Sequence, residues 1–375
     1  MEERDLHERM FSRRHFGKLA LAVPAAGLMA RTGVALAFQG QPNSVWGGVP
    51  FGVFAPYRFG PEATDLDGAL KALVRLGVSQ TEISAAPVER FCGAPQAAPA
   101  AAPAATAAPA PAAAPAPSVA PAPGAIPCVN GVPSPGGRGA GGGGGGGGRG
   151  APSPEQQAAA RAQAEALLTW RTSVPMRKFT EVKQKFSNAG VMIYAYRITL
   201  TAAMSEAEYD YAFNAAKALG ATQLTMEKPA DLTLSKRIGD AADRHQVNVG
   251  YHLHTTASMT AWDDVIAQSP RNGLQLDIGH YVAGTGESPV PLIEKLHDRI
   301  FSMHLKDRKR VCHDASENMP WGQGDTPIKA VLQTLKKNRW AIPVGIEFEY
   351  LVPSGSTWER EIAKCIQYGK DALLG

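Results

Sequence analysis

The sequence has little of several features that would by themselves point to a class of protein. It has only four cysteines in 375 residues, and none lies in a Cys-x-x-Cys pair or a Cys/His spacing typical of a structural zinc site. Aromatic residues make up 7% of the chain and the net charge is only +4, so no basic stripe interleaved with aromatic residues is present. Such a stripe is typical of nucleic-acid grooves, and we therefore expect no nucleic-acid partner.

Glycine and proline are concentrated in one tract. Ala-Pro repeats begin near Ala94 and give way to an unbroken glycine run before Pro154. The tract has no Gly-X-Y period, which excludes collagen, and it cannot bury enough apolar surface to order itself. We interpret residues 92–154 as a disordered insertion. Cys92 and Cys128 flank its Ala-Pro half and could either form a disulfide or remain free thiols.

Residues 1–37 have the pattern of an export signal. Arg13 and Arg14 precede a mild apolar stretch that closes with Ala35-Leu36-Ala37, a small-x-small cleavage pattern. The paired arginines resemble the twin-arginine export signal. We expect a bacterial protein that is periplasmic or exported, begins near Phe38 and has no membrane association after cleavage.

Outside the insertion, short apolar segments alternate with helical patterns. The predicted strands are Val49–Phe54, Val78–Ile83, Val191–Arg197, Thr222–Glu227, Val247–His254, Leu274–Ile278, Ile300–Leu305 and Val344–Phe348. The predicted helices are Asp65–Leu76, Glu155–Asn188, Ser205–Leu219, Leu232–His245, Thr260–Ala267, Val290–Leu296, Pro327–Lys337 and Thr357–Leu373. Eight strand-then-helix units in about 300 residues predict an α/β fold, a single (β/α)₈ TIM barrel over residues 38–375. The insertion then follows the second strand, in a loop on the C-terminal rim.

Polar side chains gather where the predicted strands end. In a barrel of parallel strands these ends meet at one rim, which is where functional groups lie. The candidates are Glu82, Glu227, His252, His254, Asp277, His280, His304, Lys306, Asp307 and Glu347. Asp277 could also be a loop cap and Glu82 a helix-start carboxylate.

Three of these segments resemble motifs of the sugar phosphate isomerase/epimerase superfamily, the xylose isomerase-like TIM barrels. They are Asp277-Ile-Gly-His280, His304-Leu-Lys-Asp307 and Glu347, and the resemblance is strongest from Val191 to Tyr350. The resemblance implies one divalent metal held by residues on the fifth to eighth strands. The matching positions here are His252, Asp277, His304 and Glu347.

The chain departs from the family at His252, which stands where the family has a metal-binding glutamate. Imidazole is a good ligand, but the site loses one negative charge, which favours Mn²⁺, Co²⁺, Fe²⁺ or Zn²⁺ over Mg²⁺. The resemblance also implies proton transfer beside a carbonyl by two carboxylates, through an enediolate that the metal stabilises. Glu347 is one of them, while Glu227 could replace the other, His252 could act as the base, or the activity could be lost.

The resemblance therefore implies a metal-dependent isomerase or epimerase, or a related lyase, acting on a small carbohydrate. Export favours an unphosphorylated or oxidised sugar. The predicted substrate contacts are His280, His254, Lys306 and Glu82. Two alternatives stay open: a non-catalytic periplasmic sugar-binding barrel and an endonuclease-IV-like phosphodiesterase. The sequence sets no oligomeric state.

Overall fold

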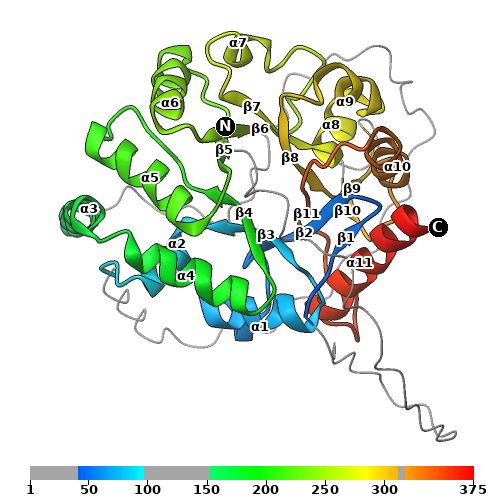
Figure 1. The fold of residues 1–375 in the computed structure, drawn as a ribbon, viewed down its shortest axis with the longest axis horizontal. Helices are drawn as coiled ribbons and strands as arrows, with labels where there is room; N and C mark the ends of the chain where they lie inside the picture. Colours follow the sequence, from blue (N-terminus) through cyan, green and yellow to red (C-terminus); the bar gives the residue numbers. More distant parts are fainter. Residues whose placement is uncertain (1–40, 97–152, 311–316) are drawn as a thin grey trace, which may run out of the picture. The chain divides into compact units, whose positions relative to one another are not determined.

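The computed structural model describes residues 41–96, 153–310 and 317–375. Within them, eight parallel strands form a closed barrel that is surrounded by helices (Figure 1). The strand β2 pairs with β3 on one side and with β11 on the other, and this double pairing closes the sheet. The predicted (β/α)₈ fold is therefore confirmed.

Each end of a barrel strand lies within two residues of its predicted position. They are β2 (Val49–Ala55), β3 (Gln80–Ser84), β4 (Met192–Arg197), β5 (Gln223–Glu227), β6 (Asn248–His252), β7 (Asn272–Asp277), β8 (Ile300–Leu305) and β11 (Val344–Ile346). Three short strands lie outside the barrel: β1 (Val45–Trp46) pairs antiparallel with β2, and β9 (Asp307–Arg308) pairs with β10 (Asn318–Met319). The barrel strands are buried on both faces, β7 throughout its length, as expected where helices cover a parallel sheet.

The helix α5 begins and ends as the sequence indicates. The described helices are η1 (Pro61–Ala63, a 3₁₀ turn), α1 (Leu66–Arg75), α2 (Ala85–Phe91), α3 (Pro154–Ser173), α4 (Arg177–Asn188), α5 (Glu206–Leu219), α6 (Leu232–His245), α7 (Asp263–Ile266), α8 (Ile278–Thr285), α9 (Val290–Leu296), α10 (Ile328–Asn338) and α11 (Trp358–Leu374). Ser205 and Glu208 form the expected capping box of α5, and Gly220 ends that helix at a φ of +80°.

The prediction of one helix over 155–188 was wrong. The chain forms α3 and α4, separated by Val174, Pro175 and Met176. Val174 has extended backbone (φ −65°, ψ 128°), because a following proline disfavours the helical conformation. Helices α2 and α8 were not predicted, since each begins directly at the end of a strand.

The predicted insertion comes after the second barrel strand, β3, and the helix α2 lies between the two. The segments on the two sides of the insertion are joined across it. Arg171 forms a buried ion pair with Glu89 (2.8 Å), Gln163 Nε2 donates to the carbonyl of Pro95 (2.8 Å), and Lys178 Nζ donates to the carbonyl of Cys92 (2.7 Å). These contacts hold α2 against α3 and α4.

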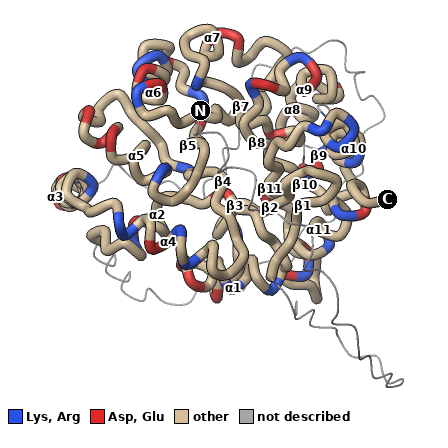
Figure 2. The backbone as a smooth tube through the Cα atoms, viewed as in Figure 1, with Lys and Arg blue, Asp and Glu red and all other residues tan. Residues whose placement is uncertain are grey.

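Several predictions fall outside the described residues. These are the signal over residues 1–37 and the cysteine at position 128. Cys92 is buried and forms no disulfide within the described part of the chain. The described helices include none that is both long and apolar enough to cross a membrane. Positions of Lys and Arg alternate with positions of Asp and Glu along the outer helices (Figure 2).

Candidate metal centre

Four predicted ligands meet at the C-terminal ends of the barrel strands. His252 ends β6, Asp277 ends β7, His304 lies in β8 beside Asp277, and Glu347 follows β11. One ligand atom from each side chain lies within 4.8 Å of the others, and all four residues are buried. We call His252, Asp277, His304 and Glu347 the four-residue cluster.

Asp277 serves two purposes with its two oxygens. Oδ1 accepts a hydrogen bond from the backbone N–H of His280 (2.7 Å) and so caps α8. Oδ2 is buried without a hydrogen bond, although Lys306 Nζ lies 3.1 Å away at ion-pair distance. Asp277 therefore does cap α8, as the alternative interpretation held, and its second oxygen faces a cation, the Lys306 ammonium.

His252 is the second member of the cluster with an unsatisfied atom. Its Nδ1 is buried and has no hydrogen-bond partner. Burial lowers the pKa of His252 well below its usual value, so the ring is neutral, which is the form that binds a metal. A buried polar atom without a partner is costly. A divalent ion would satisfy both His252 and Asp277 Oδ2, and two imidazoles with two carboxylates suit a transition metal.

His304 is held between two carboxylates. Its Nε2 lies 2.6 Å from Glu82 Oε2 and its Nδ1 lies 2.9 Å from Glu347 Oε2. Burial opposes the charged ring, but Glu347 and Glu82 outweigh it and raise the pKa of His304 to about 10. Since Glu347 belongs to the cluster and Glu82 does not, Nδ1 is the nitrogen that faces the cluster. Glu82 then holds the opposite nitrogen, as carboxylates commonly do behind metal-binding histidines.

Glu82, which we predicted as a substrate contact, is enclosed by protein groups. It is completely buried, Oε1 accepts from Thr225 (2.5 Å) and Oε2 accepts from Gln275 (2.6 Å). The structure therefore brings Glu82 to His304, in the barrel interior. It is not the helix-start carboxylate that we had considered, because Ser84 is the residue that precedes α2.

Lys306, another predicted substrate contact, is also buried in the site. Its ammonium lies 2.6 Å from Glu347 Oε2, 2.5 Å from Glu349 Oε2 and 3.1 Å from Asp277 Oδ2. Burial opposes the charge of Lys306, but these carboxylates raise its pKa above the usual value. Burial likewise opposes the charge of Glu347, but Lys306 and His304 hold its pKa well below the usual value. Glu347 is thus ionised at neutral pH.

Glu227 and His254 lie at the open rim, outside the four-residue cluster. Their side chains are 50% and 46% exposed, and His254 Nε2 is 3.7 Å from Glu227 Oε2. His254 stacks on His280 with ring centroids 4.5 Å apart. Both groups can therefore meet a solvent-borne ligand directly above the buried cluster.

His280, predicted as a substrate contact, is buried beside two cations. Lys306 Nζ is 3.1 Å from its Nε2 and Arg308 Nη1 is 2.5 Å from its Nδ1. Burial and then these cations lower the pKa of His280 well below its usual value. His280 is thus a neutral ring between the ammonium of Lys306 and the guanidinium of Arg308.

Sequence reasoning missed two site residues. Gln275 donates to Glu82, contacts His304 Nε2 at 3.1 Å and accepts from Arg197. Arg197, at the end of β4, also pairs with Glu227 at 2.6 Å. Gln275 could have been found, because it is two residues before Asp277 and a strand places such residues on one face.

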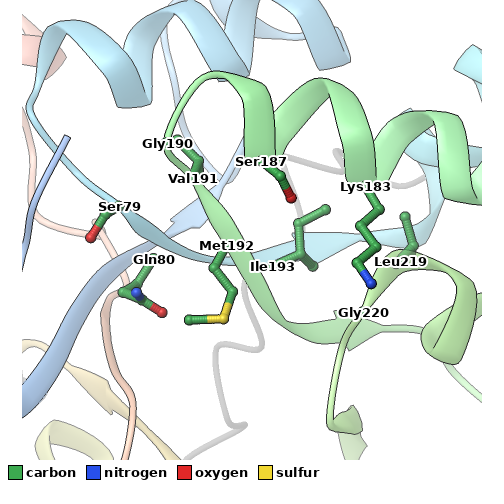
Figure 3. A pocket seen from close by; sticks show the side chains of 10 residues that line it. All are labelled: Ser79, Gln80, Lys183, Ser187, Gly190, Val191, Met192, Ile193, Leu219 and Gly220. Atoms are coloured by element: carbon green, nitrogen blue, oxygen red, sulfur yellow. The ribbon is translucent and has the colours of Figure 1, made fainter. Parts of the chain in front are cut away.

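A surface hollow of about 490 Å³ lies at the opposite end of the barrel strands (Figure 3). It is lined by Ser79, Gln80, Lys183, Ser187, Gly190, Val191, Met192, Ile193, Leu219 and Gly220. Residues such as Ser79 and Met192 lie where β3 and β4 begin, whereas the four-residue cluster lies where strands end. The lining includes no carboxylate, imidazole or thiol, so we do not assign chemistry to it.

Comparisons with known proteins agree with this architecture. Residues 208–368 match the model of a family described as xylose isomerase-like TIM barrel. A search of curated proteins gave no significant match. Among solved structures, a xylose isomerase domain protein from Planctomyces limnophilus is 12% identical, with a TM-score of 0.50 over 86% of this chain and 96% of that chain. A xylose isomerase domain protein from Alicyclobacillus acidocaldarius subsp. acidocaldarius is 13% identical, with a TM-score of 0.50 over 87% and 99%.

A third solved structure is D-psicose 3-epimerase with D-tagatose from Clostridium cellulolyticum H10. It is 11% identical, with a TM-score of 0.50 over 87% of this chain and 99% of that chain. At these identities the likeness establishes the fold, and the family model covers the half of the barrel that carries the four-residue cluster. The chain therefore has the fold of the xylose isomerase-like TIM barrels, with a buried His/Asp/Glu cluster at the C-terminal ends of its strands.

Proposed function

We propose that the protein is a divalent-metal-dependent isomerase or epimerase, or a related lyase, that acts on a small carbohydrate. The observation that carries the proposal is the convergence of His252, Asp277, His304 and Glu347 at the functional end of the barrel. Two of its buried atoms lack a hydrogen bond, His252 Nδ1 and Asp277 Oδ2, and a divalent ion could bind both, although Oδ2 already has the Lys306 ammonium at 3.1 Å. When bound there, a divalent ion would polarise a substrate carbonyl and offset the negative charge that develops on its oxygen.

The chain supplies proton-transfer groups on two sides of this position. Glu347 follows β11 and Glu227 ends β5, and these strands are four places apart around an eight-stranded barrel, hence on opposite sides. Glu347 is ionised and can accept a proton from a carbon beside the carbonyl. Glu227, with His254 beside it, can exchange a proton on the opposite face. Two groups on opposite faces are what inversion at one carbon requires.

The polar rim supports a hydroxylated ligand. Arg197, Glu227 and His254 offer donors and acceptors at the edge of the buried cluster, which suits the several hydroxyl groups of a sugar. The similar solved structure of a D-psicose 3-epimerase with D-tagatose is a precedent for carbohydrate chemistry on this fold. With the export signal that we propose for residues 1–37, an unphosphorylated or oxidised sugar in the periplasm fits best.

The test combines metal analysis with solvent proton exchange. The purified full chain would be loaded with Mn²⁺ or Co²⁺, and ketoses and oxidised sugars in D₂O followed by NMR for deuterium entering beside the carbonyl. We expect metal-dependent exchange that is lost in Asp277→Asn, a change that keeps the cap of α8. Asp264→Asn is the matched control, because Asp264 pairs with Lys228 outside the cluster and should leave exchange unchanged. Tight metal retention by Asp277→Asn would contradict the proposed site.

Binding without turnover is the alternative that one observation favours. His252 stands where the family has a carboxylate, so the pair of acids that normally moves the proton is altered. A sugar that binds by calorimetry but acquires no deuterium, with metal bound, would support a non-catalytic binding barrel.

A further inference from the structure

The ammonium of Lys306 contacts the same oxygens that a metal would use. It lies 2.6 Å from Glu347 Oε2 and 3.1 Å from Asp277 Oδ2, and Lys306 is only 2% exposed. Both carboxylates belong to the four-residue cluster. We propose that Lys306 competes with the divalent ion for Asp277 and Glu347 and thereby sets a low metal affinity. This inference rests on the proposed metal site.

The competition follows from the geometry of the shared atoms. Metal–oxygen bonds are about 2.0–2.2 Å long, so an ion bound to Glu347 Oε2 and Asp277 Oδ2 would lie next to the ammonium. The two positive charges would repel each other in a buried site, where screening by water is weak. Metal binding therefore requires the Lys306 ammonium to withdraw from the cluster.

Glu349 gives the ammonium a place to withdraw to. Its Oε2 is 2.5 Å from Lys306 Nζ, and Glu349 is not one of the four cluster residues. Glu349 is itself held in place, because its Oε1 accepts from the Tyr57 hydroxyl at 2.8 Å and its carbonyl accepts from Arg58 at 3.1 Å. Lys306 can thus leave Asp277 and Glu347 while it keeps a charged partner, which lowers the cost of admitting the ion.

This arrangement predicts opposite effects for the two partners. Lys306→Met removes the competing charge, and we expect Co²⁺ and Mn²⁺ to bind at least about tenfold more tightly. Glu349→Gln removes the alternative partner, so the ammonium stays on Asp277 and Glu347, and we expect weaker binding. If Lys306 only contacts substrate, both variants should bind the metal as tightly as the wild type.

The experiment is a metal titration of the full chain after chelation, read out by calorimetry and by the metal-induced rise in Tm. Lys228→Met is the matched control, because Lys228 pairs with Asp264 at 2.8 Å outside the cluster, and its affinity should equal that of the wild type. Glu349→Gln keeps the test decisive if Lys306→Met fails to fold.

The outcomes separate this inference from the proposed function. Tighter binding by Lys306→Met with weaker binding by Glu349→Gln supports the competition. If the wild type binds the metal, either of two results overturns the competition alone. One is that Lys306→Met binds the metal no more tightly than the wild type, and the other is that Glu349→Gln binds it no more weakly. No binding by any of these proteins overturns the metal site and the competition together.

Discussion

Binding of a divalent ion should release about one proton at pH 7, because His304 must lose its proton to become a ligand. Glu347 and Glu82 outweigh burial and keep the pKa of His304 at about 10, so the ring is almost fully protonated at pH 7. Burial raises the pKa of Asp277 to about 6, which adds about 0.1 proton at pH 7 and about 0.5 at pH 6. His252 is already neutral and adds none.

Calorimetry can count these protons. Co²⁺ would be titrated into the metal-free full chain in buffers that share one pH but differ in ionisation enthalpy, and the slope of heat against that enthalpy gives the number released. We expect about 1.1 protons released per bound ion at pH 7 and about 1.5 at pH 6. The affinity for Co²⁺ should rise about tenfold per pH unit between pH 7 and 9. His245→Gln is the control, because His245 pairs with Asp210 away from the cluster.

Glu82→Gln tests the cause of the effect. Without this carboxylate the pKa of His304 should fall, so proton release should become fractional at pH 8–9 and the affinity should depend less steeply on pH. Equal heats in all buffers for the wild type, or an affinity that does not change between pH 7 and 9, would refute the reasoning. His304 would then be either no ligand or not held protonated by its two neighbours.

Three further predictions concern stability and metal choice. The raised pKa of His304 stabilises the metal-free fold by up to about 5 kcal/mol. This stabilisation is complete below pH 6.5 and is lost as the pH rises through about 10. Denaturant unfolding at a series of pH values would measure it. Constant stability between pH 6.5 and 10 would contradict it. His252→Glu restores a carboxylate and should raise the affinity for Mg²⁺ relative to Co²⁺ by about tenfold or more, as competition titrations would show; an unchanged ratio would mean that residue 252 is not a ligand. Replacing residues 97–152 with a Gly-Ser linker should keep Tm within a few degrees. Ser153 lies about 15 Å along α3 from Gln163, which contacts Pro95, so about eight linker residues suffice. A large loss in Tm would show that the insertion takes part in folding.

Much of the barrel follows from local sequence patterns. The strands are short apolar segments that recur between amphipathic helices, and their parallel arrangement sends every strand end to one rim. The four cluster residues could be predicted because each lies at such an end, within motifs whose order and spacing are specific. Their convergence needs only the correct strand order.

The missed features depend on contacts between distant segments. Gln275 and Arg197 are unremarkable in sequence, and only the barrel brings them to Glu82 and Glu227. Glu82 was placed at a strand end, but its contact with His304 spans 222 positions of the chain. The helix α8 was missed because Asp277 ends β7 and caps α8 at once, which leaves no loop between them. Pro175 was a local signal for a helix break, but the helical pattern on both sides of it obscured that signal.

The contacts that join α2 to α3 and α4 have a consequence for how the chain is connected. The strand β3 pairs with β4 through five residues, and Arg171, Gln163 and Lys178 reach back to the segment from Glu89 to Pro95. The strands β3 and β4 are thus held together by their own hydrogen bonds and by the ion pair between Arg171 and Glu89. This holds whatever links residue 96 to residue 153. The barrel is in effect a complex of two complementary fragments, 41–96 and 153–375, that happen to share one chain. New termini could therefore be opened between residues 96 and 153 without changing any strand's neighbours.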